Sequence, residues 1–314
     1  MFGGTHGNET TGVSVVKNVL EALGLPSNPP AGTHVVDGVR GALYFGIGNP
    51  SAVARGTRGA GGPRDLNRCF HESFFSDPQA MASPDERRAA ELADLLASAD
   101  YFFDLHSVSA PNARPFVGIT TRTSRHDAIC ASLPVSIVLD VNRVLGRDVG
   151  IDDPAIDQTP TTCSWVNRHG GVGLCYEMGS QDDLDSVPRA TRDLLRLLEA
   201  CGSVDHAFSE RIGVPDLSLP TADAPANYRL THCERNRFKG FQFAEERFTK
   251  SWTPVKKGDA IGRYEDGEIV RAPDDGLLAF PAGVHTLSRN PSLFYLAKQE
   301  EKTPRDRRGA RTSA

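Results

Sequence analysis

Between residues 10 and 200 the chain alternates apolar runs with amphipathic segments, and this alternation constrains the fold more than any other feature. Valine and leucine recur at helical spacing over residues 10–23. Residues 83–97 begin with Ser-Pro-Asp-Glu, the signature of a helix with a capping box. Further strands are expected at residues 42–47, 101–105, 116–120, 137–141 and 174–178, and a further helix at residues 188–200. Strands that alternate with helices predict an α/β sheet covered on both faces.

Composition limits the classes of protein to consider. The chain has 314 residues and a formal net charge of −5, a mild charge of the wrong sign for a nucleic-acid binder. No apolar run approaches the ~20 residues that span a bilayer, so we expect no membrane insertion. The six scattered cysteines include no Cys-x-x-Cys pair, which indicates reduced thiols in a cytoplasmic protein rather than disulfides or a cysteine-ligated zinc.

The pattern changes after Cys201. Residues 213–227 are rich in proline and suit a linker, and short alternating stretches separated by Gly-Asp and Asp-Gly turns follow them. The last residues carry a net charge of +4, which favours a solvated, disordered tail. We therefore expect a first domain at residues 1–203, a smaller β-rich domain at 204–301 and a disordered basic tail at 302–314.

The strongest chemical signal opens the chain, where residues 3–9 read Gly-Gly-Thr-His-Gly-Asn-Glu. His6 and Glu9 are three residues apart, and the glycines allow a tight turn that brings both side chains together. Imidazole nitrogen and carboxylate oxygen both suit Zn²⁺, and a catalytic zinc site needs three protein ligands and an open position for water. A bare His-x-x-Glu pair is more often part of an ordinary surface loop, so the pair needs a third ligand.

His106 can supply that ligand, because it follows the expected strand 101–105 at its carboxyl end, where α/β sheets bind ligands. Asp104 lies two residues earlier on the same face and can hold the imidazole tautomer. Glu177 ends another apolar strand, where beside a metal-bound water it can act as general base and then as acid. A purely structural role at a strand end is the alternative for each of these residues.

Between these segments lies Arg-Asp-Leu-Asn-Arg at residues 64–68, preceded by Arg58. Asn67 and Arg68 can bind one carboxylate. The guanidinium donates two parallel hydrogen bonds, and the amide donates a further one. The alternative is a solvated arginine cluster paired with surface acids.

In this order, Gly-Gly-Thr-His-Gly-Asn-Glu, Asp-Leu-Asn-Arg, Asp-Leu-His and the Glu-x-Gly that contains Glu177 resemble the aspartoacylase and succinylglutamate desuccinylase family. These are zinc enzymes whose catalytic domain is similar to zinc carboxypeptidases, and the chain looks most like their aspartoacylase and aminoacylase-3 branch. The resemblance covers residue 2 to about residue 198 and extends weakly beyond. It implies a mixed α/β sheet flanked by helices, with a smaller β-rich C-terminal domain that covers the active site, and a homodimer is compatible with it.

The resemblance also implies roles for individual residues. The ligands of one Zn²⁺ per chain would be His6, Glu9 and His106, with Asp104 behind them. Glu177 would activate the zinc-bound water, and Arg58 would polarise the scissile carbonyl and stabilise the oxyanion. Asn67 and Arg68 would bind the α-carboxylate of an N-acyl amino acid, and Tyr295 would reach the substrate from the C-terminal domain.

Cys163 departs from the family pattern. Aspartoacylases carry Thr-Thr-Arg upstream of the catalytic glutamate, and that arginine takes the side-chain carboxylate of the substrate, whereas this chain has Thr-Thr-Cys. A thiol cannot replace the guanidinium, and losing such a contact costs roughly 2–5 kcal/mol. N-acetylaspartate is therefore a doubtful best substrate, and neutral or aromatic N-acetyl amino acids become comparable expectations.

The function expected from the sequence is a zinc-dependent amidohydrolase, a deacetylase that splits N-acyl-L-amino acids into a carboxylate and a free amino acid. One alternative is a zinc carboxypeptidase that acts on peptides, which a C-terminal domain over the cleft would exclude. The other is a catalytically impaired zinc-binding relic. Family members have a strand before Gly-Gly-Thr-His, where this chain offers only Met1 and Phe2.

Overall fold

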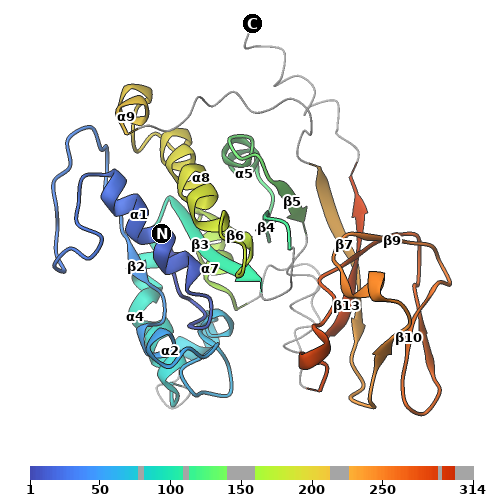
Figure 1. The fold of residues 1–314 in the computed structure, drawn as a ribbon. Coiled ribbons are helices and arrows are strands. Elements are labelled where there is room, and N and C mark those ends of the chain that lie inside the picture. Colours follow the sequence, from blue (N-terminus) through green and yellow to red (C-terminus); the bar gives the residue numbers. More distant parts are fainter. Residues whose placement is uncertain (77–80, 109–112, 140–159, 213–225, 289–291, 301–314) are drawn as a thin grey trace, which may run out of the picture.

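The computed structural model describes residues 1–76, 81–108, 113–139, 160–212, 226–288 and 292–300. The expected basic tail, and residues 213–225 of the expected linker, lie outside these ranges. Ten strands form one sheet in the order β2-β1-β3-β6-β4-β5-β7-β13-β12-β9, and helices pack around its first half (Figure 1). The expected mixed α/β architecture is confirmed.

The part of the chain before residue 213 supplies six strands and most of the helices. Its strands are β1 (Phe2–Gly3), β2 (Gly46–Ile47), β3 (Tyr101–Val108), β4 (Phe116–Ile119), β5 (Ser136–Leu139) and β6 (Val172–Ser180). Its helices are α1 (Thr11–Ala22), α2 (Pro50–Arg55), α3 (Glu72–Phe75), α4 (Pro84–Ala97), α5 (Ser124–Cys130), α7 (Thr162–Arg168), α8 (Ser186–Ala200) and α9 (His206–Arg211), with the 3-10 helix η1 (Leu66–Arg68).

Local sequence accounts for several of these boundaries. At the start of α4 the Ser83 hydroxyl accepts a hydrogen bond from the Glu86 amide, and the Glu86 carboxylate accepts one from the Ser83 amide. This reciprocal capping box is the one that the sequence predicts. The strand expected at residues 42–47 is shorter than predicted, because only Gly46 and Ile47 pair with β1.

The strand β1 is only two residues long, yet it is an inner strand. Phe2 pairs with Gly46 on one side and Asp104 on the other, and both pairings are parallel. The sequence offers only Met1 and Phe2 before the Gly-Gly-Thr-His motif, and this short pairing holds that motif against β3.

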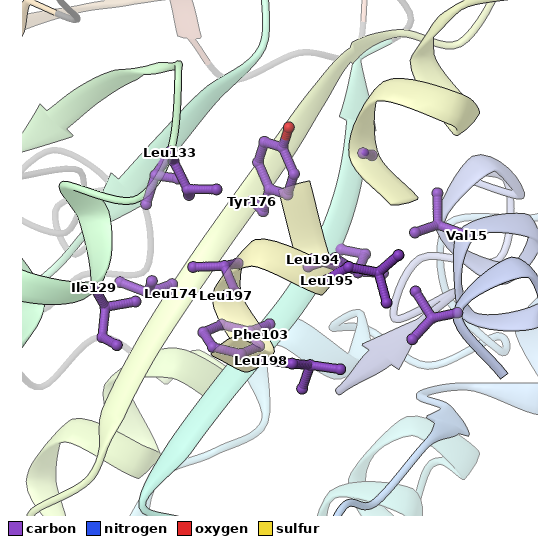
Figure 2. Packing of buried hydrophobic residues seen from close by; sticks show 14 of the residues in the cluster. Val15, Phe103, Ile129, Leu133, Leu174, Tyr176, Leu194, Leu195, Leu197 and Leu198 are labelled. Atoms are coloured by element: carbon purple, nitrogen blue, oxygen red, sulfur yellow. The ribbon is translucent and has the colours of Figure 1, made fainter. Parts of the chain in front are cut away.

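Successive side chains of β3 and β6 point to opposite faces of the sheet. Phe103, Leu105, Leu174 and Tyr176 point to the face covered by α1, α5 and α8 and join the largest apolar cluster (Figure 2). Their neighbours in sequence point to the opposite face. That opposite face therefore carries Asp104, His106 and Glu177, and it is where the chemistry must be sought.

The C-terminal part is β-rich, as expected. Its strands are β7 (Asn227–Arg235), β8 (Gln242–Phe243), β9 (Thr253–Val255), β10 (Ala260–Arg263), β11 (Ile269–Arg271), β12 (Gly276–Ala279) and β13 (Ser292–Gln299), with the 3-10 helices η3 (Glu246–Thr249) and η4 (Val284–Thr286). Strand β7 pairs in parallel with β5, so β7, β13, β12 and β9 extend the main sheet, while β8, β10 and β11 form a small sheet of their own. The division at residues 203 and 204, and the covering of the active site by this part, remain predictions.

Within the described residues, no helix has both the length and the apolar character needed to cross a membrane.

Candidate metal and catalytic site

The turn between β1 and α1 carries His6 and Glu9, and its shape requires glycine. Gly4 has a left-handed backbone with φ of +69°. A Cβ on Gly7 would lie 2.0 Å from the backbone of Ala52 in α2, so only glycine lets the two segments approach this closely. The glycines of the motif thereby set the position of both side chains.

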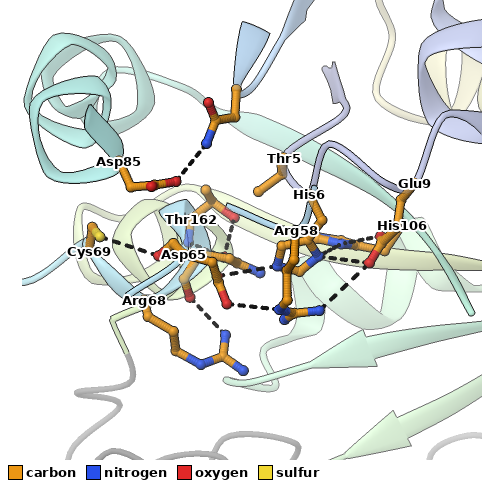
Figure 3. Close-up of polar contacts among 12 residues, drawn as sticks. Thr5, His6, Glu9, Arg58, Asp65, Arg68, Cys69, Asp85, His106 and Thr162 are labelled. Carbon is orange, nitrogen blue, oxygen red and sulfur yellow. Dashed lines mark hydrogen bonds and ion pairs between the residues drawn. The ribbon is translucent and has the colours of Figure 1, made fainter. Parts of the chain in front are cut away.

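His6, Glu9 and His106 converge on one buried point (Figure 3). Their candidate ligand atoms all lie within 4.8 Å of one another. Nδ1 of His6 lies 2.8 Å from Oε1 of Glu9, Nδ1 of His106 lies 3.0 Å from Oε2, and the two Nδ1 atoms are 3.1 Å apart. The structure therefore brings together the three residues that the sequence singles out as ligands.

This donor set fits a divalent metal ion. Two imidazole nitrogens and one carboxylate oxygen match the three protein ligands of a catalytic zinc site, and other first-row metals also accept such donors. Burial acts to raise the pKa of Glu9, but the adjacent imidazoles of His6 and His106 outweigh it and hold the pKa below its ordinary value. The site thus keeps an ionised carboxylate between two imidazoles, as a cation requires.

Asp104 stands behind His106. Its Oδ2 lies 3.1 Å from Nε2 of His106, close enough for an ion pair although not aligned for a hydrogen bond. The Asp104 carboxylate accepts hydrogen bonds from the hydroxyls of Thr5 at 2.6 Å and Thr162 at 2.5 Å. These contacts hold the carboxylate where it keeps Nδ1 of His106 directed at the cluster.

Asp65 plays the corresponding part behind His6, and the sequence analysis missed it. Its Oδ1 lies 3.2 Å from Nε2 of His6, and its Oδ2 accepts a hydrogen bond from Nε of Arg58 at 2.9 Å. Burial acts to raise the pKa of Asp65, but His6 and Arg58 outweigh it and lower the pKa. The available signal was its place in Asp-Leu-Asn-Arg, but the spacing alone does not show that this carboxylate turns back to His6.

Glu177 lies on β6 directly opposite His106 of β3 in the strand register. Burial raises its pKa to about 7, and the charge of Glu9 adds to the rise, while the imidazoles of His106 and His6 and the guanidinium of Arg58 oppose it. A carboxyl group with a pKa near neutrality beside a candidate metal site is suited to taking up and releasing a proton.

Arg58 lies at the exposed side of the cluster. Its guanidinium is half exposed, and Nη1 lies 3.8 Å from Oε1 of Glu9. Its backbone carbonyl accepts a hydrogen bond from the Gly7 amide at 3.3 Å, which ties the arginine loop to the His6 turn. The structure therefore places a cation beside the cluster.

Asn67 and Arg68 form part of η1, next to the start of α7. The Asn67 Oδ1 accepts a hydrogen bond from the amide of Thr162 at 3.0 Å and lies 3.1 Å from the Thr162 hydroxyl oxygen. Nη1 of Arg68 donates to the Asn67 carbonyl at 2.8 Å. Because Thr162 also binds Asp104, these contacts link the expected carboxylate-binding pair to the support of His106.

Cys163 lies in the first turn of α7. Its side chain is 3% exposed and packs in an apolar cluster with Trp165 and Val166. A side chain in such a cluster stabilises the fold, and the place of Cys163 at the substrate remains a prediction.

Tyr295 lies on β13, and four strands of the sheet separate β13 from β3. Its hydroxyl donates to Ser292 at 3.2 Å, and its ring lies 6.1 Å from that of Phe280. These contacts all lie within the C-terminal part, so its role at the substrate remains a prediction.

A cavity of about 520 Å³ lies at the amino-terminal end of β3, lined by Phe2, Phe45 and Tyr101 among others. Each of the predicted site residues lies elsewhere. The carboxyl ends of β1 and β3, rather than this cavity, therefore hold the candidate site.

Comparisons with known proteins identify the family of the chain. The sequence model of the succinylglutamate desuccinylase/aspartoacylase catalytic domain matches residues 1–196. An N-acyl-aromatic-L-amino acid amidohydrolase (carboxylate-forming) B from Danio rerio is 31% identical over 187 residues, which are 57% of this chain and 53% of that protein. A probable aspartoacylase from Nostoc sp. is 32% identical over 115 residues, 35% of each chain. The matches thus span about half or less of these relatives.

Solved structures share the fold. A succinylglutamate desuccinylase/aspartoacylase from Rhodobacter sphaeroides has a TM-score of 0.65 at 18% identity and covers 96% of this chain and 84% of its own. Murine aminoacylase 3 has a TM-score of 0.57 at 21% identity and covers 95% of this chain and 94% of its own. The architecture therefore extends well beyond the segment that the sequence model matches.

Proposed function

Because this chain belongs to the succinylglutamate desuccinylase/aspartoacylase family, we propose that it is a zinc-dependent amidohydrolase that deacylates N-acyl-L-amino acids. The observation that carries the proposal is the convergence of His6, Glu9 and His106 on one buried point. Glu177 adds a proton-accepting group on the adjacent strand, opposite His106. Together these residues provide the parts that hydrolysis of a linear amide requires.

Nδ1 of His6, Nδ1 of His106 and the carboxylate of Glu9 would hold the metal ion. A zinc ion bound there would lower the pKa of a water molecule and polarise a carbonyl group. Asp65 and Asp104 hold the two imidazoles with Nε2 toward a carboxylate and Nδ1 toward the cluster.

The chain's own residues then handle the proton and the developing charge. Glu177 accepts a proton from the attacking water and returns it to the nitrogen of the departing amine. Arg58 donates to the carbonyl oxygen as it gains negative charge: Asp65 holds its Nε, and the half-exposed guanidinium keeps further N–H donors on its Nη atoms. Asn67 and Arg68 bind the α-carboxylate, which fixes the amide against Glu177.

The proposed substrates are N-acetylaspartate and neutral or aromatic N-acetyl amino acids. Two relatives are described as probable aspartoacylases and one as an N-acyl-aromatic-L-amino acid amidohydrolase. We expect zinc-loaded protein to release free amine from N-acetylaspartate, N-acetylphenylalanine or N-acetylmethionine, and to leave an unacylated tripeptide intact. Release of the C-terminal residue from the tripeptide alone would instead identify a carboxypeptidase.

Asp65 allows a test of how the site is held together. We expect Asp65→Asn to weaken zinc affinity by about 10–100-fold, because the amide cannot orient His6 and Arg58 together as the carboxylate does. Competition with a coloured chelator measures this affinity. The matched control is Asp266→Asn, a surface aspartate paired with Lys239, which should bind zinc like the unchanged protein. Equal affinity in Asp65→Asn would remove Asp65 from the site.

A further inference from the structure

Beyond Glu177, the face of the sheet that carries the metal site continues into a group of aromatic rings. This group, here named the aromatic cluster, consists of Phe116, Tyr228, Trp252, Phe280 and Tyr295. Phe116 comes from β4, next to the catalytic strands, and the other four come from the C-terminal part. The cluster is thus the place where the C-terminal part meets the strands of the site.

The strand register places this cluster beside the reacting groups. Glu177 pairs with His106 on one side and with Phe116 on the other. Side chains of directly paired residues lie on the same face, with Cβ atoms about 4.5–5.5 Å apart. His106, Glu177 and Phe116 therefore form one row across the sheet, and the row passes from metal ligand to proton acceptor to aromatic ring.

The rings of Phe280 and Trp252 pack against Phe116, and both residues are themselves only partly buried. The ring centres of Phe116 and Phe280 are 4.9 Å apart, and those of Trp252 and Phe280 are 5.6 Å apart. Phe116 is only 7% exposed, whereas Trp252 and Phe280 are half-buried. An apolar group that approached Glu177 from this side would meet the rings of Phe280 and Trp252.

The backbone at both rings is unusual. Trp252 has φ of +66° and Phe280 has φ of +49°, a left-handed region that is strained for a non-glycine residue. Trp252 donates its amide to the Leu278 carbonyl at 2.7 Å, and Phe280 donates its amide to the Ser251 hydroxyl at 3.1 Å. The fold therefore holds two large rings at positions where glycine would be more favourable, and both rings point into the same cluster.

We propose that Phe280 and Trp252 form the specificity-determining wall of the substrate site and bind an aromatic or similarly large apolar group of the N-acyl amino acid. This inference rests on the proposed function and names its preferred substrate class. Stacked or edge-to-face rings attract one another, whereas a carboxylate placed against them loses hydration without gaining a partner. The wall therefore favours aromatic over acidic substrates.

The first test compares Phe280→Gly with the unchanged enzyme, both loaded with zinc. Glycine removes the ring and also relieves the left-handed backbone, so the variant should fold. The matched control is Phe238→Gly, since Phe238 also has a positive φ, of 56°, but is 57% exposed. We expect the ratio of kcat/KM for N-acetylphenylalanine to that for N-acetylalanine to fall about tenfold in Phe280→Gly, the size of one lost aromatic contact. In the control the ratio should not change.

N-benzoylalanine shows which end of the substrate carries the ring to the wall. If Phe280→Gly lowers kcat/KM relative to N-acetylalanine only for N-acetylphenylalanine, the amino-acid side chain contacts the wall. If it lowers that ratio only for N-benzoylalanine, the acyl group contacts the wall. Either result supports the wall. Unchanged ratios for both substrates, or an equal loss on all three, would overturn it.

A binding measurement keeps this inference separate from the proposed function. The chain has two tryptophans, so the fluorescence of zinc-loaded Glu177→Gln reports on Trp252 once the signal of Trp252→Phe is subtracted. We expect N-acetylphenylalanine to change this signal in a saturable way and N-acetylaspartate to do so only at much higher concentration. If the unchanged enzyme shows no turnover but this signal is present, the proposed hydrolase activity is refuted and the proposed wall is retained. Turnover without the signal would refute the wall alone.

Discussion

Replacement of Glu177 by glutamine lowers kcat for every N-acyl amino acid by about 10²–10⁴-fold while zinc binding is retained, which is the range expected for loss of a general base. The amide has the shape of the carboxyl group, but it cannot take a proton from water or return one to the leaving amine. The residue lies opposite His106 without being among the three converging ligands, so the metal site should keep its affinity.

The measurement is a steady-state assay on protein whose zinc content has been determined. Glu234→Gln is a matched control. Like Glu177, Glu234 lies on a strand and has a histidine neighbour, here His232 at 3.1 Å, but it belongs to the C-terminal part and not to the site. It should keep full activity. A kcat for Glu177→Gln within tenfold of the unchanged enzyme would mean that another group moves the proton, and the assignment of Glu177 would fail.

Removal of the metal should have an effect at least as large. We expect Glu9→Gln to lose zinc and to lower kcat/KM by about 10³-fold or more, because a bound metal ion supplies several kcal/mol of transition-state stabilisation. The Glu9 carboxylate contacts both imidazoles and also accepts a hydrogen bond from the Ser107 amide at 3.1 Å. Its neutral isostere has no negative charge to balance a metal ion, and its single oxygen would have to serve both the ion and the Ser107 amide.

Zinc content and activity are measured on the same samples of Glu9→Gln, with Glu210→Gln as control. Glu210 is an exposed glutamate on α9 that pairs with His206. The control should contain as much zinc as the unchanged protein. Full activity of Glu9→Gln at an undiminished zinc content would show that the ion sits elsewhere.

The local features of this fold could be predicted from the sequence. The capping box of α4 and the strands around residues 101–105 and 174–178 depend on side-chain period and short-range hydrogen bonds, and the structure contains them. The rule that ligand-binding residues lie at the carboxyl ends of strands was enough to predict that His106 lies near His6 and Glu9, and the structure brings the three together.

Features that depend on distant pairings could not be predicted. Nothing near residue 227 indicates that β7 will pair with β5 and so join the C-terminal part to the main sheet. The same holds for Asp65, whose carboxylate bends back to His6 across 59 positions of sequence. The packing of Cys163 is a further example, since its place in a motif does not show that its side chain joins an apolar cluster with Trp165 and Val166.

The central claim is that the buried His6, Glu9 and His106 cluster holds the zinc ion that makes this chain a hydrolase. Its most direct test is a zinc titration of metal-free protein with amine release from N-acetylphenylalanine and N-acetylaspartate followed at each step. We predict that activity rises in proportion to added zinc and levels off at about one ion per chain, the stoichiometry of a single catalytic site. Activity that is already complete before zinc is added, or that stays absent after one ion has bound, would contradict the claim.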